Sequence, residues 1–158
     1  MDEINTIDDL DHRLLRALQS DARLSTAELG EKLALSQSPT WRRLKRLEQM
    51  GTIAGYQAVL SRQKLGYSVL AMVTVGVDSH DEASARAFEQ GISVIPEIVW
   101  CHGMSGAEDF VLMVVARDLE HFSQLLMGKL RTLSSVKSLR SSFSLKAVKD
   151  DMAIKLPL

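Results

Sequence analysis

The sequence predicts an α+β protein in which an N-terminal winged-type helix-turn-helix is joined to a C-terminal ferredoxin-like βαββαβ domain. Two observations predict it. The first third of the 158-residue chain carries three short amphipathic helix patterns, and the rest alternates between strand and helix character. The expected domains are 1–52 for the helix-turn-helix, 53–66 for an extended linker strand and 67–158 for the ferredoxin-like part.

Bulk composition restricts the class of protein before any motif is considered. Hydrophobic residues make up 46% of the chain and charged residues 25%, which excludes disordered and fibrous classes. The single cysteine, Cys101, rules out an internal disulfide. The acidic N-terminus lacks the regions of a signal peptide, and no apolar run reaches the roughly 20 residues that span a bilayer. We therefore expect a cytoplasmic protein that does not bind a membrane.

The first predicted helix runs from about Asp8 to Ser20. Apolar residues recur there at positions i, i+4, i+7 and i+8, which places them on one face of a helix. Acidic residues crowd the first turn, where carboxylates interact favourably with the positive end of the helix dipole. The apolar stripe consists of Leu10, Leu14, Ala17 and Leu18, and the first-turn acids are Asp8, Asp9 and Asp11.

The second predicted helix, about Thr26 to Ala34, carries its own start signal. Ser25 and Glu28 have the spacing of a capping box, in which each side chain bonds a backbone N–H near the helix start. Gly30 lies inside this helix at a cost of about 1 kcal/mol relative to alanine. A close approach by a neighbouring helix would explain that glycine.

The third predicted helix, Ser38–Met50, begins at a serine followed by a proline and ends before Gly51. Serine is a good N-cap, proline suits the first helical position, and glycine readily adopts the left-handed conformation that ends a helix. Thr40, Leu44 and Leu47 form its inward stripe. The basic residues point elsewhere and are Arg42, Arg43, Lys45 and Arg46.

Positive charge is concentrated on and after this third helix. The chain has a net charge of −1, but the segment 36–66 holds basic residues against a single acid, Glu48. A basic run alone could be a solvated surface. Two short helices joined by Leu35, Ser36 and Gln37, with the second helix carrying the charge, indicate a DNA-binding helix-turn-helix. We expect double-stranded DNA as the partner, with the arginines and the lysine mainly on phosphates.

Residues at the start of the second helix of this motif reach base edges in the major groove. We therefore expect Gln37, Ser38 and Thr40 close to bases. Trp41 fits two roles, packing against the first helix or lying along the DNA backbone or against a thymine methyl. The complete set of expected DNA contacts is Ser36, Gln37, Ser38, Thr40, Trp41, Arg42, Arg43, Lys45 and Arg46.

After Gly51 the pattern becomes extended over Thr52–Leu60, which either forms a hairpin wing or bridges to a second domain through 61–66. The remaining segments follow the order β-α-β-β-α-β, which is typical of an antiparallel sheet with both helices on one face. The expected strands are Ser68–Val77, Ile92–His102, Phe110–Ala116 and Val136–Leu145, and the expected helices are Asp81–Gly91 and Asp118–Leu130.

The first of these strands is apolar on both sides. Val73, Val75 and Val77 share one face, whereas Met72, Thr74 and Gly76 share the other. One face is expected to meet the helices, so we expect the other to pack against a second subunit.

Enzymatic chemistry finds little support in the sequence. The histidines His12, His80, His102 and His121 are scattered, with no metal-binding motif, phosphate-binding loop or dinucleotide glycine pattern beside them. Cys101 and His102 with Asp109 could form a metal or thiol site, but a buried cysteine and an edge histidine fit the pattern better. We expect no enzyme activity, no metal and no cofactor.

The chain as a whole resembles the Lrp/AsnC family of transcriptional regulators, named after the leucine-responsive and asparagine regulators and also called feast-or-famine regulators. The N-terminal signature of that family is present as Ile7-Asp8-x-x-Asp11-x-x-Leu14-Leu15 and Leu24-Ser25-x-x-Glu28-Leu29. The recognition-helix signature is present as Leu35-Ser36-x-Ser38-Pro39-x-x-x-Arg43-Leu44-x-Arg46-Leu47-Glu48-x-x-Gly51-x-Ile53. The ligand-binding motif G-x-x-G-x-x-D is present as Gly103, Gly106 and Asp109.

Two positions depart from the family pattern. Thr40 stands where many members have cysteine. Ala107 and Glu108 stand where many members have an acidic residue followed by an aromatic one.

The resemblance implies that the C-terminal domain dimerises through its sheet, assembles dimers into tetramers or octamers, and binds an effector amino acid near the glycine-aspartate turn. The chemistry of the turn is compatible, because glycines let backbone N–H groups approach a carboxylate and an aspartate can pair with an α-ammonium. A tight hairpin with a structural aspartate is the alternative. The expected effector-binding residues are Gly103, Met104, Ser105, Gly106 and Asp109.

Effector occupancy is expected to change how dimers pack, and therefore which spaced half-sites on DNA are engaged together. An effector-independent, nucleoid-organising DNA-binding protein is the alternative function. It would share the same DNA-binding helix and lack a functional ligand site.

Overall fold

The computed structural model describes residues 6–78, 82–133, 136–149 and 156–157. The chain divides into two compact units, Met1–Gln57 and Ala58–Leu158. The boundary between them falls inside the predicted linker 53–66. Each unit is described by itself below.

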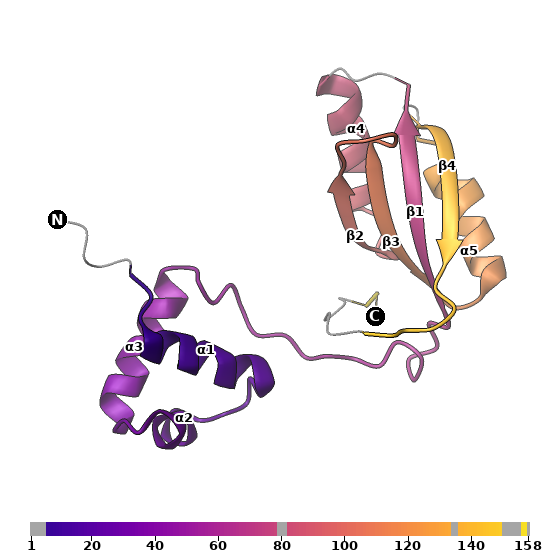
Figure 1. Ribbon diagram of the computed structural model, residues 1–158. Coiled ribbons are helices and arrows are strands. Elements are labelled where there is room, and N and C mark those ends of the chain that lie inside the picture. Colours follow the sequence, from indigo (N-terminus) through magenta and orange to yellow (C-terminus); the bar gives the residue numbers. More distant parts are fainter. Residues whose placement is uncertain (1–5, 79–81, 134–135, 150–155, 158) are drawn as a thin grey trace. The chain divides into compact units, whose positions relative to one another are not determined.

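Unit 1 contains three helices, α1 (Asp9–Ser20), α2 (Thr26–Leu33) and α3 (Gln37–Gln49) (Figure 1). The predicted capping box of α2 is confirmed, since Ser25 accepts a hydrogen bond from the Glu28 N–H and Glu28 accepts one from the Ser25 N–H. Asp8 and Asp11 form a second capping box at the start of α1. The apolar core of unit 1 consists of Leu14, Leu18, Leu29, Leu33 and Leu47.

The third helix begins before the predicted serine. Ser36 is the N-cap, Gln37 is the first helical residue, and Pro39 occupies the third helical position. The expectation that Ser38 caps this helix is therefore wrong. The reason is that none of the N–H groups in the first turn has an intrahelical partner, so a proline is tolerated at any of these positions. The predicted stop is confirmed, because Gly51 follows the C-cap with φ of +71°.

The glycine inside α2 lies at a close approach, as predicted. A Cβ atom on Gly30 would come within 2.7 Å of the Leu35 carbonyl oxygen and 3.3 Å of Thr40 Oγ1 on α3. The absence of a side chain at this position therefore lets α3 and the turn before it pack onto α2.

The segment Thr52–Leu60 forms neither helix nor strand, and the side chains of Tyr56, Val59 and Leu60 are exposed. The segment therefore does not form the hairpin wing that was one of its two expected structures. The segment runs as an irregular connection from α3 into unit 2.

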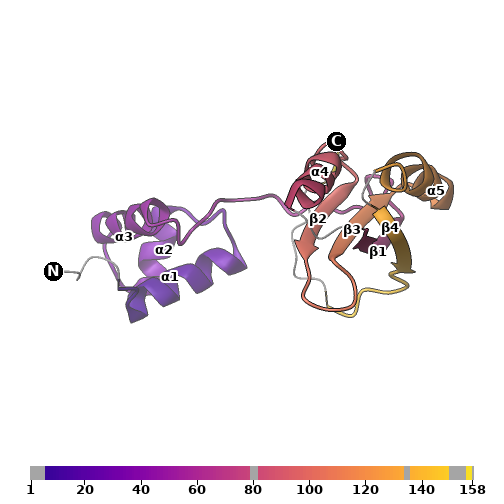
Figure 2. The ribbon, with the colours of Figure 1, turned by 90° about the horizontal axis from the view of Figure 1, so that it is seen from above.

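Unit 2 contains a four-stranded sheet in the order β2-β3-β1-β4, and every neighbouring pair is antiparallel. Helices α4 and α5 cover the same face of this sheet (Figures 1 and 2). This is the predicted ferredoxin-like arrangement. In chain order the elements are β1 (Val69–Val77), α4 (Glu82–Ser93), β2 (Ile98–Gly103), β3 (Phe110–Ala116), α5 (Leu119–Leu125), the π-helical turn η1 (Leu126–Leu130) and β4 (Val136–Phe143).

The second strand starts later than predicted. The helix α4 continues to Ser93, so the expected strand Ile92–His102 is wrong in its first residues. Phe88, Ile92 and Ile95 are all buried in the core at helical spacing, which explains why isoleucines are found in and just after a helix. The predicted start of this helix at Asp81 lies outside the described residues.

The core of unit 2 lies between the sheet and its helices. Val73, Val75 and Val77 on β1 pack there with Phe88 of α4 and Phe122 of α5. The alternation predicted for β1 is present, since Met72 and Thr74 are partly exposed. No helix within the described residues is long and apolar enough to cross a membrane.

Candidate nucleic-acid interface and ligand turn

The outer face of α3 carries polar, aromatic and basic side chains. Residues spaced three or four apart share one helix face, and on this face the side chains are exposed, with Trp41 at 52%. The exposure of Trp41 disfavours packing against α1, one of the two roles weighed for it. We define the outer face as Gln37, Ser38, Trp41, Arg42 and Lys45, preceded by the exposed N-cap Ser36.

The inner face of α3 packs into unit 1. Thr40 has no exposed surface, and its Oγ1 donates a hydrogen bond to the Ser36 carbonyl oxygen at 2.9 Å. The Thr40 side chain therefore cannot reach a base edge, and the prediction that it contacts DNA is wrong. The inward stripe of Thr40, Leu44 and Leu47 predicted from spacing is the arrangement observed.

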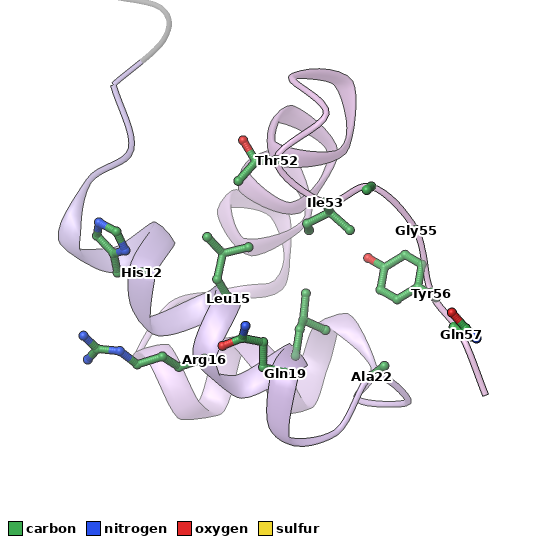
Figure 3. A pocket seen from close by; sticks show the side chains of 12 residues that line it. His12, Leu15, Arg16, Gln19, Ala22, Thr52, Ile53, Gly55, Tyr56 and Gln57 are labelled. Carbon is green, nitrogen blue, oxygen red and sulfur yellow. The ribbon is translucent and has the colours of Figure 1, made fainter. Parts of the chain in front are cut away.

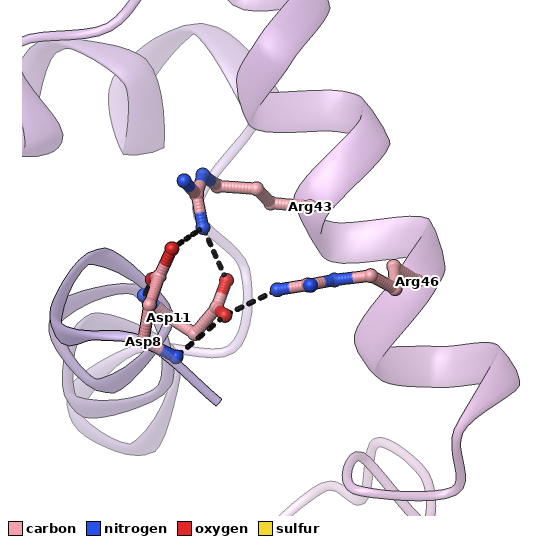
Figure 4. A network of polar contacts seen from close by, with 4 residues as sticks. All are labelled: Asp8, Asp11, Arg43 and Arg46. Atoms are coloured by element: carbon pink, nitrogen blue, oxygen red, sulfur yellow. Dashed lines mark hydrogen bonds and ion pairs between the residues drawn. The ribbon is translucent and has the colours of Figure 1, made fainter. Parts of the chain in front are cut away.

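Two of the four basic residues of α3 turn toward α1 instead of outward (Figure 4). Arg43 Nη1 lies 2.8 Å from Asp11 Oδ1 and 2.6 Å from Asp8 Oδ2. Arg46 Nη2 donates to Asp11 Oδ2, which also accepts the Asp8 backbone N–H at 3.0 Å. The Asp11 side chain has no exposed surface, so its carboxylate is buried but has hydrogen-bond donors on both oxygens. This group of Asp8, Asp11, Arg43 and Arg46 is called the inner ion network below.

The inner ion network shifts the pKa values of Asp8 and Arg43. The pKa of the Asp8 carboxyl lies below its ordinary value because the Asp11 backbone N–H and the Arg43 guanidinium both stabilise the carboxylate. The pKa of Arg43 is raised, mainly by its hydrogen bond to Asp8. Both groups are therefore charged at neutral pH.

Sequence reasoning assigned Asp8 and Asp11 to the helix dipole and missed their contact with α3. One signal was available. Asp8 and Asp11 have the i, i+3 spacing of the capping box that was recognised at Ser25, and Arg43 and Arg46 have the same spacing on α3. Matching pairs of opposite charge on two helices of one small unit could have indicated the ion pairs, but not the burial of Asp11.

On the outer face, Lys45 has a different environment. Its Nζ lies 2.7 Å from Glu48 Oε2, and Glu48 Oε1 accepts a hydrogen bond from the Tyr56 hydroxyl at 3.0 Å. Lys45 and Tyr56 together lower the pKa of Glu48. The Arg42 side chain is exposed and makes no hydrogen bond or ion pair within the part of the chain that the structure describes.

A hollow of about 520 Å³ lies between α1 and the segment that follows α3 (Figure 3). Its lining mixes apolar side chains such as Leu15 and Ile53 with the polar side chains of His12, Arg16 and Gln19. None of the residues predicted to bind DNA or an effector lines it.

The turn between β2 and β3 is closed by backbone hydrogen bonds and by one carboxylate. The Met104 N–H donates to the Asp109 carbonyl oxygen at 2.8 Å, and Asp109 Oδ2 accepts the Val77 N–H at 2.8 Å. Asp109 thus ties the turn to the end of β1. Gly106 has open space around it, since a Cβ atom at this position would meet no described atom within 4 Å. The five residues expected to bind an effector lie together on this turn.

Glu108, one of the departures from the family pattern, is directed at the sheet. Its Oε1 lies 3.2 Å from Arg140 Nη1 on β4, and a Cβ on Gly76 would come within 3.3 Å of its Oε2. Sequence reasoning did not identify this pairing, because β4 lies about thirty positions further along the chain.

The cysteine and histidine beside the turn have different environments. Cys101 packs against the core of unit 2, and burial together with the nearby Glu89 raises its pKa, which disfavours the thiolate. The His102 ring packs against Trp100 in a tilted arrangement, with ring centroids 4.1 Å apart. Among the described residues, no group of three or more His, Cys, Asp or Glu could hold a metal ion.

Both units match known protein families. Residues 7–48 match the AsnC-type helix-turn-helix domain, and residues 70–154 match the Lrp/AsnC ligand binding domain. The leucine-responsive regulatory protein of Rhizobium meliloti is 32% identical over 150 residues, which cover 95% of this chain and 96% of that protein. The Bkd operon transcriptional regulator of Pseudomonas aeruginosa is 35% identical over 142 residues, which cover 90% of this chain and 93% of that protein.

The likeness extends to solved structures. A transcriptional regulator from Neisseria meningitidis, solved as a complex with L-methionine, is 31% identical and superimposes with a TM-score of 0.90. The match covers 95% of this chain and 97% of that one.

A helix-turn-helix with a cationic outer helix face, followed by a ferredoxin-like domain of the ligand-binding type, defines a DNA-binding transcriptional regulator. The chain belongs to the Lrp/AsnC family. The resemblance noted in the sequence is therefore confirmed.

Proposed function

We propose that this regulator contacts DNA with the outer face of α3, and that an amino acid bound at the turn Gly103–Asp109 changes its self-assembly and thereby its operator binding. The observation that carries the DNA part is the division of α3 into an exposed face with Arg42 and Lys45 and a packed face with Thr40 and Leu47. Only the exposed face can enter a major groove.

Within the outer face, chemistry assigns different roles. Ser36, Gln37 and Ser38 lie at the helix start, where short polar side chains can read base edges. Arg42 and Lys45 lie further along the helix and supply positive charge for phosphates. The exposed Trp41 ring lies between these two groups and is available for the DNA backbone or a thymine methyl.

The effector part of the proposal is supported by four findings. The Lrp/AsnC ligand binding domain match includes the turn, and the Neisseria meningitidis regulator was solved with L-methionine. The space around Gly106 leaves the backbone of the turn open to a ligand. Asp109 Oδ2 accepts the Val77 N–H, and a carboxylate is a group that can pair with an α-ammonium.

The assembly part of the proposal is supported by the sheet of unit 2. Helices α4 and α5 cover one face only (Figure 2), and Met72 and Met113 are partly exposed on paired positions of β1 and β3. Partly apolar sheet faces of this kind are suited to pairing with a second copy. A dimer, and tetramers or octamers of dimers, would place copies of α3 at fixed spacing on DNA.

Calorimetric titration with each of the twenty amino acids tests the effector part. We expect at least one to bind, to change the oligomer size seen by light scattering, and to change DNA affinity. Gly106→Val should remove the binding heat, while Gly55→Ala, at a linker position that also has open space, should leave it unchanged. If no amino acid binds, or if one binds without changing assembly and DNA affinity, the effector-independent DNA-organising function is favoured instead.

A further inference from the structure

We infer that Arg43 and Arg46 are positioning residues that hold α3 against α1 through the buried Asp11 carboxylate, and that they do not contact the DNA backbone. The inference deepens the role of α3 in DNA binding and rests on that role. It separates the four basic residues of the helix into two outward cations, Arg42 and Lys45, and two inward ones.

Burial of Asp11 carries the first step. A carboxylate without exposed surface is stable only when charged or polar donors replace water at its oxygens. Arg43 Nη1 and Arg46 Nη2 bind different oxygens of Asp11, and the Asp8 N–H donates to one of these oxygens. Withdrawing either arginine toward a phosphate would leave a buried charge partly unpaired.

The two arginine side chains are also less exposed than that of Lys45. Their side chains are 25% and 34% exposed, whereas the Lys45 side chain is 47% exposed. Arg43 makes contact with Asp8 as well as Asp11, so a single nitrogen is shared between two carboxylates. Phosphates would have to compete with both.

The geometry gives these contacts a positioning role. Arg43 and Arg46 lie nearly one turn apart on α3, and both end on one carboxylate of α1 (Figure 4). Two anchor points on one side chain restrict both the rotation of α3 about its axis and its sliding along α1. The apolar part of the contact, made by leucines such as Leu14 and Leu47, is less directional. The outer face therefore depends on the inner ion network for its orientation toward DNA.

Asp11→Asn and Glu48→Gln provide a matched test, since each removes one negative charge that is paired with a basic residue of α3. We would measure binding of the full chain to a fluorescent duplex selected from a random-sequence library with the wild-type chain. Glu48→Gln removes the acid that pairs with Lys45 and should leave the affinity unchanged or raise it. Asp11→Asn should lower the affinity by about tenfold or more, at a temperature where hydrogen exchange shows unit 1 folded. An Asp11→Asn variant that binds as tightly as Glu48→Gln, or more tightly, would overturn the inference, because released arginines would then be reaching phosphates.

Arg46→Gln gives a second test that does not depend on the folding of Asp11→Asn. Affinity falls as salt rises, and loss of one phosphate contact lowers the magnitude of the slope of log affinity against log salt by about 0.9. Loss of a positioning residue should weaken binding while the slope stays as in the wild type, and Arg46→Lys, which keeps an ion pair, should recover part of the affinity. A slope reduced by about 0.9 in Arg46→Gln would show that Arg46 contacts DNA and would contradict the inference.

Discussion

Unit 1 and unit 2 use different interactions to hold their secondary structure together. Unit 1 packs buried leucines beside a buried carboxylate, Asp11, that two arginines bind. Unit 2 packs valines, leucines and phenylalanines between a sheet and its helices, and its described residues include no charged side chain that is fully buried.

The difference follows from size. A unit of fewer than about 60 residues buries a smaller fraction of its surface and has a marginal apolar core. Helix caps and ion pairs then contribute more to the placement of its helices, and burial of apolar side chains contributes less. A larger sheet domain can specify its structure by packing alone. We therefore expect charge and cap substitutions to act on unit 1, and apolar truncations to act most strongly on unit 2.

The largest expected effect is that of Phe88→Ala. Phe88 is fully buried and its ring centroid lies 4.5 Å from that of Phe110. Truncation should reduce the free energy of unfolding of unit 2 by about 3–5 kcal/mol. Hydrogen exchange resolved by peptide would show faster exchange throughout unit 2 and no change in unit 1. Equal effects in both units would mean that they do not differ as described.

Gly30→Ala should destabilise unit 1 although alanine is the better helix former. The added Cβ would meet the Leu35 carbonyl oxygen at 2.7 Å, and the backbone must move to relieve this contact. We expect a loss of about 1–3 kcal/mol, measured by the same exchange experiment. Gly55→Ala has open space and serves as the control; an unchanged or increased stability of Gly30→Ala would show that α2 and α3 are less tightly packed than we describe.

The two N-cap serines of unit 1 should respond differently to alanine. Ser25 accepts the Glu28 N–H, whereas Ser36 makes no side-chain capping hydrogen bond. Ser25→Ala should cost about 1 kcal/mol, and Ser36→Ala should cost much less. Thermal unfolding followed by circular dichroism at 222 nm, where helices dominate the signal, would separate the two; similar losses would contradict the role given to the Ser25 cap.

The smallest expected effect concerns acid. The pKa of the Asp8 carboxyl is lower in the folded chain than its ordinary value of 3.8. Such a carboxyl stabilises the fold at pH values above 3.8, and this stabilisation is lost as the pH falls through the lower pKa of the folded chain. For Asp8 the contribution should be below about 1 kcal/mol, because its side chain is about half exposed. The stability of unit 1 should therefore fall as pH drops below about 4, and Asp8→Asn should make this fall shallower. An unchanged pH profile in Asp8→Asn would show that Asp8 does not contribute.

Local features of this chain could be predicted from the sequence, and long-range ones could not. The Ser25 cap, the stop at Gly51 and the leucine stripes depend on residues a few positions apart, and all are present in the structure. The ion pairs of Asp11 join residues more than thirty positions apart. Periodicity could not show that a carboxylate in a helix's first turn would be fully buried.

The errors at Thr40 and at β2 have a related cause. Thr40 fits both an inward apolar stripe and a position near the helix start, and its complete burial decides between them. Ile92 and Ile95 resembled the start of a strand because β-branched residues favour strands, but Ile92 lies in α4, Ile95 lies just after it, and both are buried in the core of unit 2. In both cases packing against a distant segment determined the outcome.

The central claim is that the outer and inner faces of α3 have different tasks, and adjacent arginines test it most directly. Arg42 is exposed, and Arg43 is bound to Asp8 and Asp11. We would measure DNA affinity at several salt concentrations for Arg42→Gln and Arg43→Gln in the full chain. The account predicts that Arg42→Gln lowers the magnitude of the salt slope by about 0.9 and that Arg43→Gln weakens binding at an unchanged slope. A lowered slope for Arg43→Gln with an unchanged slope for Arg42→Gln would contradict it.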